Sequence, residues 1–161
     1  MKFFRKETIN VPRDEETETV DTYMVRYMFD FFRNVCINVI LGDDMIPGLK
    51  EQSRVSGLHN HPWDYFTLVL WGGYYETLVI DGEQVTKKRR PGWFAFRKYN
   101  EYHSLRPINK KAITLFIRFK RRQFCTYYMV DDKPISEVRY WLKQGYSKEY
   151  YRKRIEEDKL S

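Results

Sequence analysis

Residues that usually carry metal and redox chemistry are scarce in this chain of 161 residues, which contains three histidines and two cysteines. Cys36 and Cys125 lie too far apart for a C-x-x-C motif, which excludes the short-spaced zinc and redox sites. We expect both to be buried apolar thiols on strands, in preference to a disulfide or zinc ligands. The few histidines are therefore the main clue to function.

Long apolar segments are also missing. No run approaches the roughly 18 apolar residues that a membrane-spanning helix needs. The N-terminus lacks the apolar stretch of a secretion signal and is soon interrupted by acidic residues. We therefore expect a cytoplasmic protein with no membrane partner.

The composition fits one domain with a real core, because 42% of the residues are hydrophobic and 17% are aromatic. We divide the chain into an N-terminal arm (residues 1–20), a barrel (21–146) and a C-terminal helix (147–161). Ser147 is a suitable N-cap for that helix, which we expect to pack on the outside of the barrel or against a second subunit.

Positive charge exceeds negative charge, with a net charge of +7, and it gathers in two clusters at residues 87–90 and 118–122. Both clusters could attract an anion such as a nucleotide or an acidic metabolite. The alternative is that they are solvated strand ends that discourage edge-to-edge pairing. No zinc-finger spacing or basic heptad array is present, so we do not expect nucleic acid to be the partner.

Short segments rich in β-branched and aromatic residues alternate with turn signals, which predicts an all-β protein. The turn signals are Gly72-Gly73, Asp81-Gly82 and Pro91-Gly92. Many short antiparallel strands suggest a closed double-sheet barrel, since closure removes exposed sheet edges. The predicted strands are residues 23–31, 34–41, 63–71, 74–80, 84–89, 93–97, 103–106, 112–120 and 123–130.

The segment AITLFIRFK (residues 112–120) shows the period of two most clearly. We expect Ile113, Leu115, Ile117 and Phe119 to form its inward face. Arg118 and Lys120 would then lie on the outer face.

The three histidines are placed as one small metal site would need them. His59 and His61 form an H-x-H pair, and residues i and i+2 of a strand point to the same side. His103 from a neighbouring strand would complete a face of three imidazoles, with other metal positions open for water or substrate. A metal-free pocket lined by the same histidines is the alternative.

The segments GLHNHPWDYFTLVLWGGYYE (residues 57–76) and RRPGWFAFRKYNEYHSLRP (89–107) resemble the two motifs of the cupin superfamily. More narrowly, the H-x-H-P-W-D-[FY] block resembles a widespread group of small bacterial and phage cupin-like proteins. The resemblance spans about residues 23–140. It implies a single-domain cupin barrel of the double-stranded β-helix (jelly-roll) type, a homodimer, and His59, His61 and His103 as metal ligands.

The chain departs from the cupin pattern at the glutamate that usually follows the second histidine by four or five residues. Those positions hold Tyr65 and Phe66. The resemblance therefore implies a three-histidine site, unless Asp64 or Glu76 replaces the missing acid.

Five residues in or near the motifs are further candidates for the site. Trp63, Tyr65 and Arg97 are our candidate substrate-binding residues; Arg97 could clamp a carboxylate or phosphate if it points inward, or be a surface charge if it points outward. The catalytic residues stay unknown, with Asp64 and Tyr102 as candidates. Asp64 paired with His61, with Tyr102 or Tyr65 as the acid, could act as base and acid, which is how the metal-free sugar-nucleotide epimerases of the cupin superfamily work.

These observations lead to one functional hypothesis and two rivals. The first is a metal-binding cupin, with iron, nickel, manganese or zinc, that acts as a dioxygenase or isomerase on a small anionic molecule. The second is a non-catalytic cupin that binds or sequesters a nucleotide-like molecule. Nucleic-acid binding through the basic clusters is the third and weakest.

Overall fold

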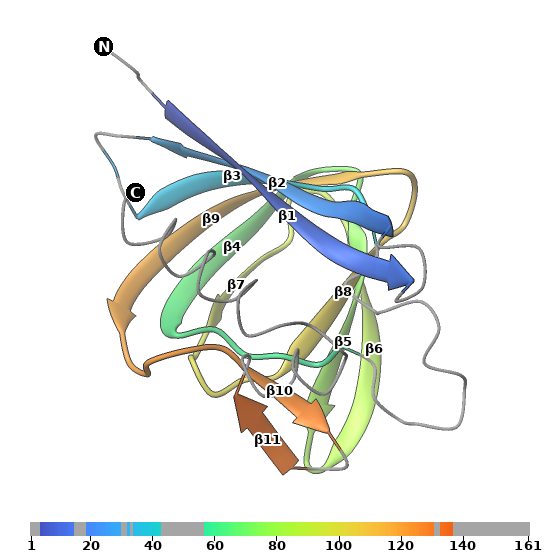
Figure 1. The fold of residues 1–161 in the computed structure, drawn as a ribbon, viewed down its shortest axis with the longest axis vertical. Helices are drawn as coiled ribbons and strands as arrows, with labels where there is room; N and C mark the ends of the chain where they lie inside the picture. Colours follow the sequence, from blue (N-terminus) through green and yellow to red (C-terminus); the bar gives the residue numbers. More distant parts are fainter. Residues whose placement is uncertain are drawn as a thin grey trace.

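The computed structural model describes residues 4–14, 19–29, 32, 34–42, 57–130 and 133–136, and all regular secondary structure among these is β-strand (Figure 1). This confirms the all-β prediction. The strands are β1 (Phe4–Asp14), β2 (Thr19–Phe29), β3 (Val35–Ile40), β4 (Trp63–Trp71), β5 (Tyr74–Ile80), β6 (Glu83–Arg89), β7 (Phe94–Arg97), β8 (His103–Pro107), β9 (Ala112–Arg121), β10 (Tyr127–Val130) and β11 (Lys133–Ser136).

The strands form two antiparallel sheets. The larger has the order β1-β2-β3-β9-β4-β7, and the smaller has the order β6-β5-β8. Residues 58–60 extend the smaller sheet, because His59 pairs with His103 of β8 on one side and with Tyr128 of β10 on the other. The hairpin of β10 and β11 continues it.

The tight turns lie where the dipeptides predict them. Asp81 and Gly82 both have positive φ, at 52° and 82°, as a two-residue hairpin turn between β5 and β6 requires. Gly73, between β4 and β5, has φ 92°, and a Cβ there would lie 2.5 Å from the Arg89 carbonyl oxygen. The turn is therefore restricted to glycine by both its φ and its contact with the end of β6.

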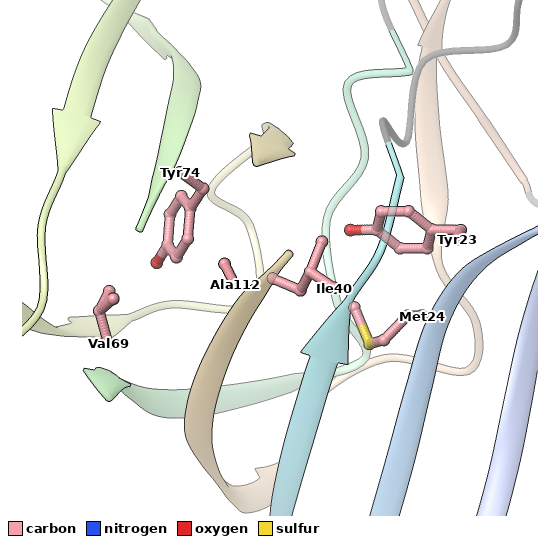
Figure 2. Packing of buried hydrophobic residues seen from close by; sticks show 6 residues of the cluster. All are labelled: Tyr23, Met24, Ile40, Val69, Tyr74 and Ala112. Atoms are coloured by element: carbon pink, nitrogen blue, oxygen red, sulfur yellow. The ribbon is translucent and has the colours of Figure 1, made fainter. Parts of the chain in front are cut away.

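The core lies between the two sheets. Tyr74 of β5 faces Val69 and Ala112 of the larger sheet, and the cluster continues toward β2 and β3 (Figure 2). Its buried members are Tyr23, Met24, Ile40, Val69, Tyr74 and Ala112. Residues from both sheets therefore pack against one another in this cluster.

The inward face of β9 is opposite to the predicted one. Ala112, Thr114 and Phe116 are the buried residues, and Arg118 follows them in the same alternation. The residues expected inside, such as Ile113, are half-buried, and Phe119 is 47% exposed. The prediction was wrong because a period of two defines two faces without saying which is inner. On β9 the inner face includes two polar residues, Thr114 and Arg118.

Three further expectations concern the N-terminus, the cysteines and the C-terminus. Residues 4–14, which we assigned to an arm, form β1, the edge strand of the larger sheet, which pairs with β2. Cys36 is a fully buried free thiol on β3, as expected, whereas Cys125 is half-buried in the link between β9 and β10 and not on a strand. The predicted C-terminal helix lies outside the described residues. No helix long and apolar enough to cross a membrane occurs in the described part.

Candidate metal centre

The backbone of the smaller sheet brings the histidines together. The amide N–H of His59 donates to the carbonyl of His103, and the amide of His103 donates back to His59, both at 2.9 Å. His61 follows two residues later, just before β4, so it projects to the same side as His59. Two of the side chains therefore come from the smaller sheet and the third from the link that leads into β4, and they meet inside the barrel.

The three imidazoles surround one point. Their ring centroids are 5.1 Å, 5.2 Å and 5.1 Å apart, and the candidate ligand nitrogens all lie within 4.8 Å of one another. The Nε2 atoms of His61 and His103 are 3.0 Å apart. Two nitrogens bound at about 2.1 Å to one metal ion, at roughly a right angle, would have about this separation.

The Nδ1 atoms of two of the histidines have partners of their own, which fixes the tautomers of His59 and His103. The Nδ1–H of His59 donates to the Gly57 carbonyl at 2.9 Å. The Nδ1 of His103 lies 3.4 Å from Oε1 of Glu76, which is the usual arrangement for a ligand imidazole oriented by a carboxylate. Both tautomers place the unprotonated nitrogen at Nε2, which is the atom that would bind a metal.

The environment keeps two of the imidazoles neutral. Burial, with the charge of His103, lowers the pKa of His59 to about 3. Burial also lowers the pKa of His61 well below its ordinary value, followed by the charges of His103 and His59. Because a metal binds the neutral form of imidazole, these ligands carry no proton that a metal would have to displace near neutral pH.

Glu76 is a buried carboxylate that connects the histidines to two arginines. Its side chain is 1% exposed, and its Oε2 accepts hydrogen bonds from Arg89 and Arg97, each at 2.7 Å. Burial alone would raise the pKa of Glu76, but the hydrogen bond and charge of His103, with Arg97 and Arg89, lower it to about 2. Glu76 thus contacts His103 at its Nδ1 atom and is not one of the grouped metal-ligand candidates.

Tyr65 occupies the position where the cupin pattern has a glutamate. Its hydroxyl lies 3.4 Å from both ring nitrogens of His103, and its ring stacks on Phe116 with a centroid distance of 4.6 Å. Burial and the charge of Glu76 raise the pKa of Tyr65 well above its ordinary value. Tyr65 therefore places a neutral hydroxyl beside the three histidines.

Trp63 forms part of the wall next to His61. The two rings are nearly parallel, with an interplanar angle of 12° and centroids 6.4 Å apart. The guanidinium carbon of Arg118 lies 5.1 Å from the Trp63 ring. The indole Nε1 is buried and has no hydrogen-bond partner among the described residues.

Asp64 and Tyr102 lie next to site residues in the sequence but are held by other groups. The Asp64 carboxylate accepts hydrogen bonds from the Tyr99 amide at 3.0 Å and from Arg122 at 2.9 Å. Tyr102 is half-buried, and burial and Tyr127 raise its pKa. The contacts described for either residue do not include the imidazoles of the triad.

The side chain of Arg97 points inward, and its guanidinium forms ion pairs with two carboxylates of the protein. Its side chain is 13% exposed and it binds Glu101 at 3.1 Å as well as Glu76. It also lies 5.7 Å from the Trp93 ring. Of the two orientations that the sequence left open, the structure has the inward one, with the guanidinium acting on Glu76.

Sequence reasoning missed two arginines of the interior. Arg89 was counted in a surface cluster, yet its guanidinium lies 4.0 Å from the Trp93 ring and binds Glu76. Arg26 of β2 was not singled out at all, although it lies between the buried Met24 and Met28. Alternation with two buried methionines was the signal that could have found Arg26.

Comparison with known proteins gives matches in structure alone. No protein-family model matches the chain, and no curated protein matches its sequence. Solved structures similar to it include Fe(II)-HppE with the alternative substrate (S)-1-HPP, at a TM-score of 0.48 and 13% identity over 71% of this chain and 56% of that one. The hydroxypropylphosphonic acid epoxidase from S. wedmorenis in complex with fosfomycin matches at a TM-score of 0.44 and 13% identity, over 60% and 51% of the chains.

The Drosophila melanogaster CENP-C cupin domain is also similar, at a TM-score of 0.43 and 14% identity over 70% of this chain and 76% of that one. The chain spans just over half the length of the HppE structures. The narrower resemblance to bacterial and phage proteins stays a prediction.

Proposed function

We propose that this chain is a cupin that binds one divalent metal ion through His59, His61 and His103. The observation that carries the proposal is the 3.0 Å separation of two Nε2 atoms, with the Nδ1 atoms of His59 and His103 held elsewhere. Three imidazole nitrogen donors suit iron(II), nickel, manganese or zinc, and they leave the remaining coordination positions to water or a ligand.

The bound metal would supply a Lewis acid, or a site for activating dioxygen, so we propose a mononuclear metal-dependent enzyme of the dioxygenase or isomerase type. The chain's own residues do the positioning. Glu76 orients His103, Tyr65 offers a neutral hydroxyl beside it, and the rings of Trp63 and Phe116 line the side of His61.

Metal content of protein purified without an affinity tag tests the proposal. We expect close to one metal ion per chain in the wild type and a large loss in His59→Ala, His61→Ala and His103→Ala. Asp64→Asn is the matched control, because Asp64 lies in the same segment but binds Arg122 and the Tyr99 amide. Equal metal content in the histidine variants and the control would reject the assignment.

A metal-free binding pocket is the second candidate function. A distance of 3.0 Å between Nε2 atoms is also that of an N–H···N hydrogen bond between two neutral imidazoles. The protein would then bind a nucleotide-like molecule without catalysis. Metal-free wild-type protein whose melting temperature rises with nucleotides, but not with divalent metals, would favour this function.

We also propose that the protein is a homodimer. The outer face of the larger sheet exposes large apolar side chains: Phe94 is 60% exposed, Phe96 69% and Phe119 47%. Phe96 and Phe119 stack on each other across this face, with centroids 6.1 Å apart. A contiguous apolar patch of this kind suits a second copy of the chain.

Light scattering of the wild type and of Phe96→Asp tests the homodimer. We expect a dimeric wild type and a monomeric Phe96→Asp variant, and a monomeric wild type would contradict the proposal.

A further inference from the structure

Three segments of the chain meet at the end of the barrel where β4 turns into β5. A Cβ at Gly72 would clash with the Lys111 carbonyl oxygen, and one at Gly73 would lie 2.5 Å from the Arg89 carbonyl oxygen. The amide of Ile108 also donates to the Gly73 carbonyl oxygen at 3.1 Å. The glycine turn is therefore in contact with the loop after β6 and with the loop between β8 and β9. None of the three segments contains an acidic residue: 71–75, 88–93 and 106–112.

The basic side chains of this end are exposed and have no carboxylate partner. Arg89 is the exception, because it points inward to Glu76. The others are exposed, and none of them forms an ion pair within the part of the chain that the structure describes. Like charges held close together without counter-charges attract a polyanion, which replaces their bound ions. We call these residues, together with Trp71, the basic rim: Lys88, Arg90, Arg106, Lys110 and Lys111.

Aromatic rings lie among these cations. Lys88 on β6 and Arg106 on β8 are the cross-strand neighbours of Tyr75, and their charged groups lie 5.8 Å and 5.2 Å from its ring centroid. The Nζ atom of Lys111 lies 5.3 Å from the ring centroid of Trp71, which is 50% exposed. The rings thus hold the cations in place, and one lysine covers one face of the indole at most. The exposed part of Trp71 is a flat surface on which a base can stack.

The second basic cluster, residues 118–122, is not an equivalent surface. Arg122 forms an ion pair with Asp64 at 2.9 Å, and Arg121 donates hydrogen bonds to two backbone carbonyl groups. Lys120 is the exposed cation of that cluster for which the structure describes no such partner. Most of the positive charge of the second cluster is therefore engaged within the protein, whereas that of the basic rim is not.

We propose that the basic rim binds single-stranded nucleic acid, with phosphates at the lysines and arginines and a base stacked on Trp71. Proteins that bind single strands without sequence preference combine positive charge along the backbone with an aromatic platform for the bases. A duplex keeps its bases inside the stack, so an exposed indole favours a single strand. This mode needs no base-reading helix or finger, and their absence was the reason for not expecting a nucleic-acid partner from the sequence.

The basic rim is separate from the three histidines. Trp63, which lies beside His61, and Trp71 are the two ends of β4, a strand of nine residues and a length of roughly 25 Å. The inference therefore does not depend on the metal. Lys111→Gln and Trp71→Ala should retain the metal content of the wild type, so a failure of the metal assignment and a failure of this inference give different results.

Fluorescence anisotropy with labelled oligonucleotides tests the basic rim. Oligothymidylate and oligouridylate of about 20 nucleotides, longer than a typical single-strand site, serve as separate DNA and RNA probes. We expect saturable binding of at least one of them by the wild type. The logarithm of the association constant should fall linearly with that of the salt concentration, with a slope of about −3 to −4 if all the cations contact phosphates.

The two kinds of contact predict different variant behaviour. Lys111→Gln should weaken binding several-fold and make the salt slope shallower by about 0.7, because one phosphate contact is lost. Trp71→Ala should weaken binding by about tenfold without changing the slope, because it removes a stacking surface and no charge. A purely structural effect of either substitution would not divide in this way between affinity and salt dependence.

The second cluster supplies matched controls. Lys120→Gln removes the same charge as Lys111→Gln, from an exposed lysine at the opposite end of β9. Phe124→Ala matches Trp71→Ala, because Phe124 is 87% exposed and lies 6.0 Å from the guanidinium of Arg121. Both controls should bind the probes as the wild type does. Equal weakening by the two lysine variants would show that net charge alone attracts the probe, and would overturn the inference.

Three further results would overturn it. The first is a wild type that binds neither oligonucleotide saturably. The second is a Trp71→Ala variant that binds as tightly as the wild type, or a duplex of the same length that binds as tightly as the single strand. The third is displacement of the oligonucleotide by poly-glutamate at an equal concentration of charge, which would assign the basic rim to an acidic protein partner instead.

Discussion

The Nδ1 atom of His103 lies 3.4 Å from Oε1 of Glu76, a carboxylate held from the other side by Arg89 and Arg97. This relationship links the three histidines to an ion-pair network that crosses β5, β6, β7 and β8. The orientation of His103 thus depends on Glu76 and on the two arginines that hold Glu76 in place.

Replacing Glu76 by Gln should destabilise the protein strongly. The change removes the buried negative charge and leaves the inward arginines Arg89 and Arg97 without it, a loss of about 3 to 5 kcal/mol. Urea unfolding measures the free energy. Glu101→Gln is the control, since Glu101 is 38% exposed and should cost no more than about 1 kcal/mol. Equal losses for the two variants would show that burial of Glu76 is not the determining factor.

The same substitution should also weaken metal binding in the molecules that fold. Carboxylates that orient ligand imidazoles commonly contribute about 10- to 100-fold to metal affinity. Competition with a chromophoric chelator would measure the affinity of folded Glu76→Gln and Glu101→Gln proteins. An affinity of Glu76→Gln equal to that of the control would mean that Glu76 does not orient His103.

Gly73→Ala should be more destabilising than Gly82→Ala. Both glycines have positive φ, 92° and 82°, so both substitutions force alanine into a conformation that it disfavours. Only at Gly73 would the new Cβ approach backbone, at 2.5 Å from the Arg89 carbonyl oxygen, whereas Gly82 has nothing within 4 Å. We expect a loss of about 1 kcal/mol at Gly82 and clearly more at Gly73. Equal losses measured by thermal unfolding would show that the turn moves freely away from β6.

Metal-free protein should lose stability as the pH falls below about 6.5. The pKa of His59 is near 6.5 when the chain is unfolded and about 3 when it is folded. Between these values the unfolded chain binds a proton that the folded chain does not, so acid favours unfolding. His61 acts in the same direction, because its pKa is also lowered.

The expected slope is about 1.4 kcal/mol per pH unit for each such histidine, and above pH 6.5 the two groups contribute none. Denaturant midpoints at a series of pH values measure it. His59→Gln, which cannot titrate in this range, should have a shallower slope than the wild type. An unchanged slope in that variant would show that His59 takes up its proton in the folded state as well.

The sequence predicted the strands better than it predicted what faces the interior. Gly82 and Gly92 marked the turns because the required positive φ is a local property. The face of β9 was wrong because which side of a strand is buried depends on the neighbouring strands. In this sheet the apolar Ile113, Leu115 and Ile117 lie on the outer side.

The histidine cluster was predictable because His59 and His61 are two residues apart, which in extended chain puts them on one side, and because His103 is the third of only three histidines. The partners of these residues were not. Glu76 and Arg89 lie on adjacent strands and meet only through their register, Glu76 being opposite Lys87 and two positions from Arg89. The alternation of Arg26 with Met24 and Met28 indicates that it faces inward, but its position over the Phe116 ring of β9 depends on how the strands of the larger sheet pair.

The central claim is that three imidazoles hold one metal ion, and X-ray absorption spectroscopy of the metal-loaded protein tests it most directly. The account predicts three imidazole nitrogen scatterers at about 2.0 to 2.2 Å, falling to two in His103→Ala. A spectrum fitted by oxygen ligands alone, or one that is unchanged in His103→Ala, would contradict it.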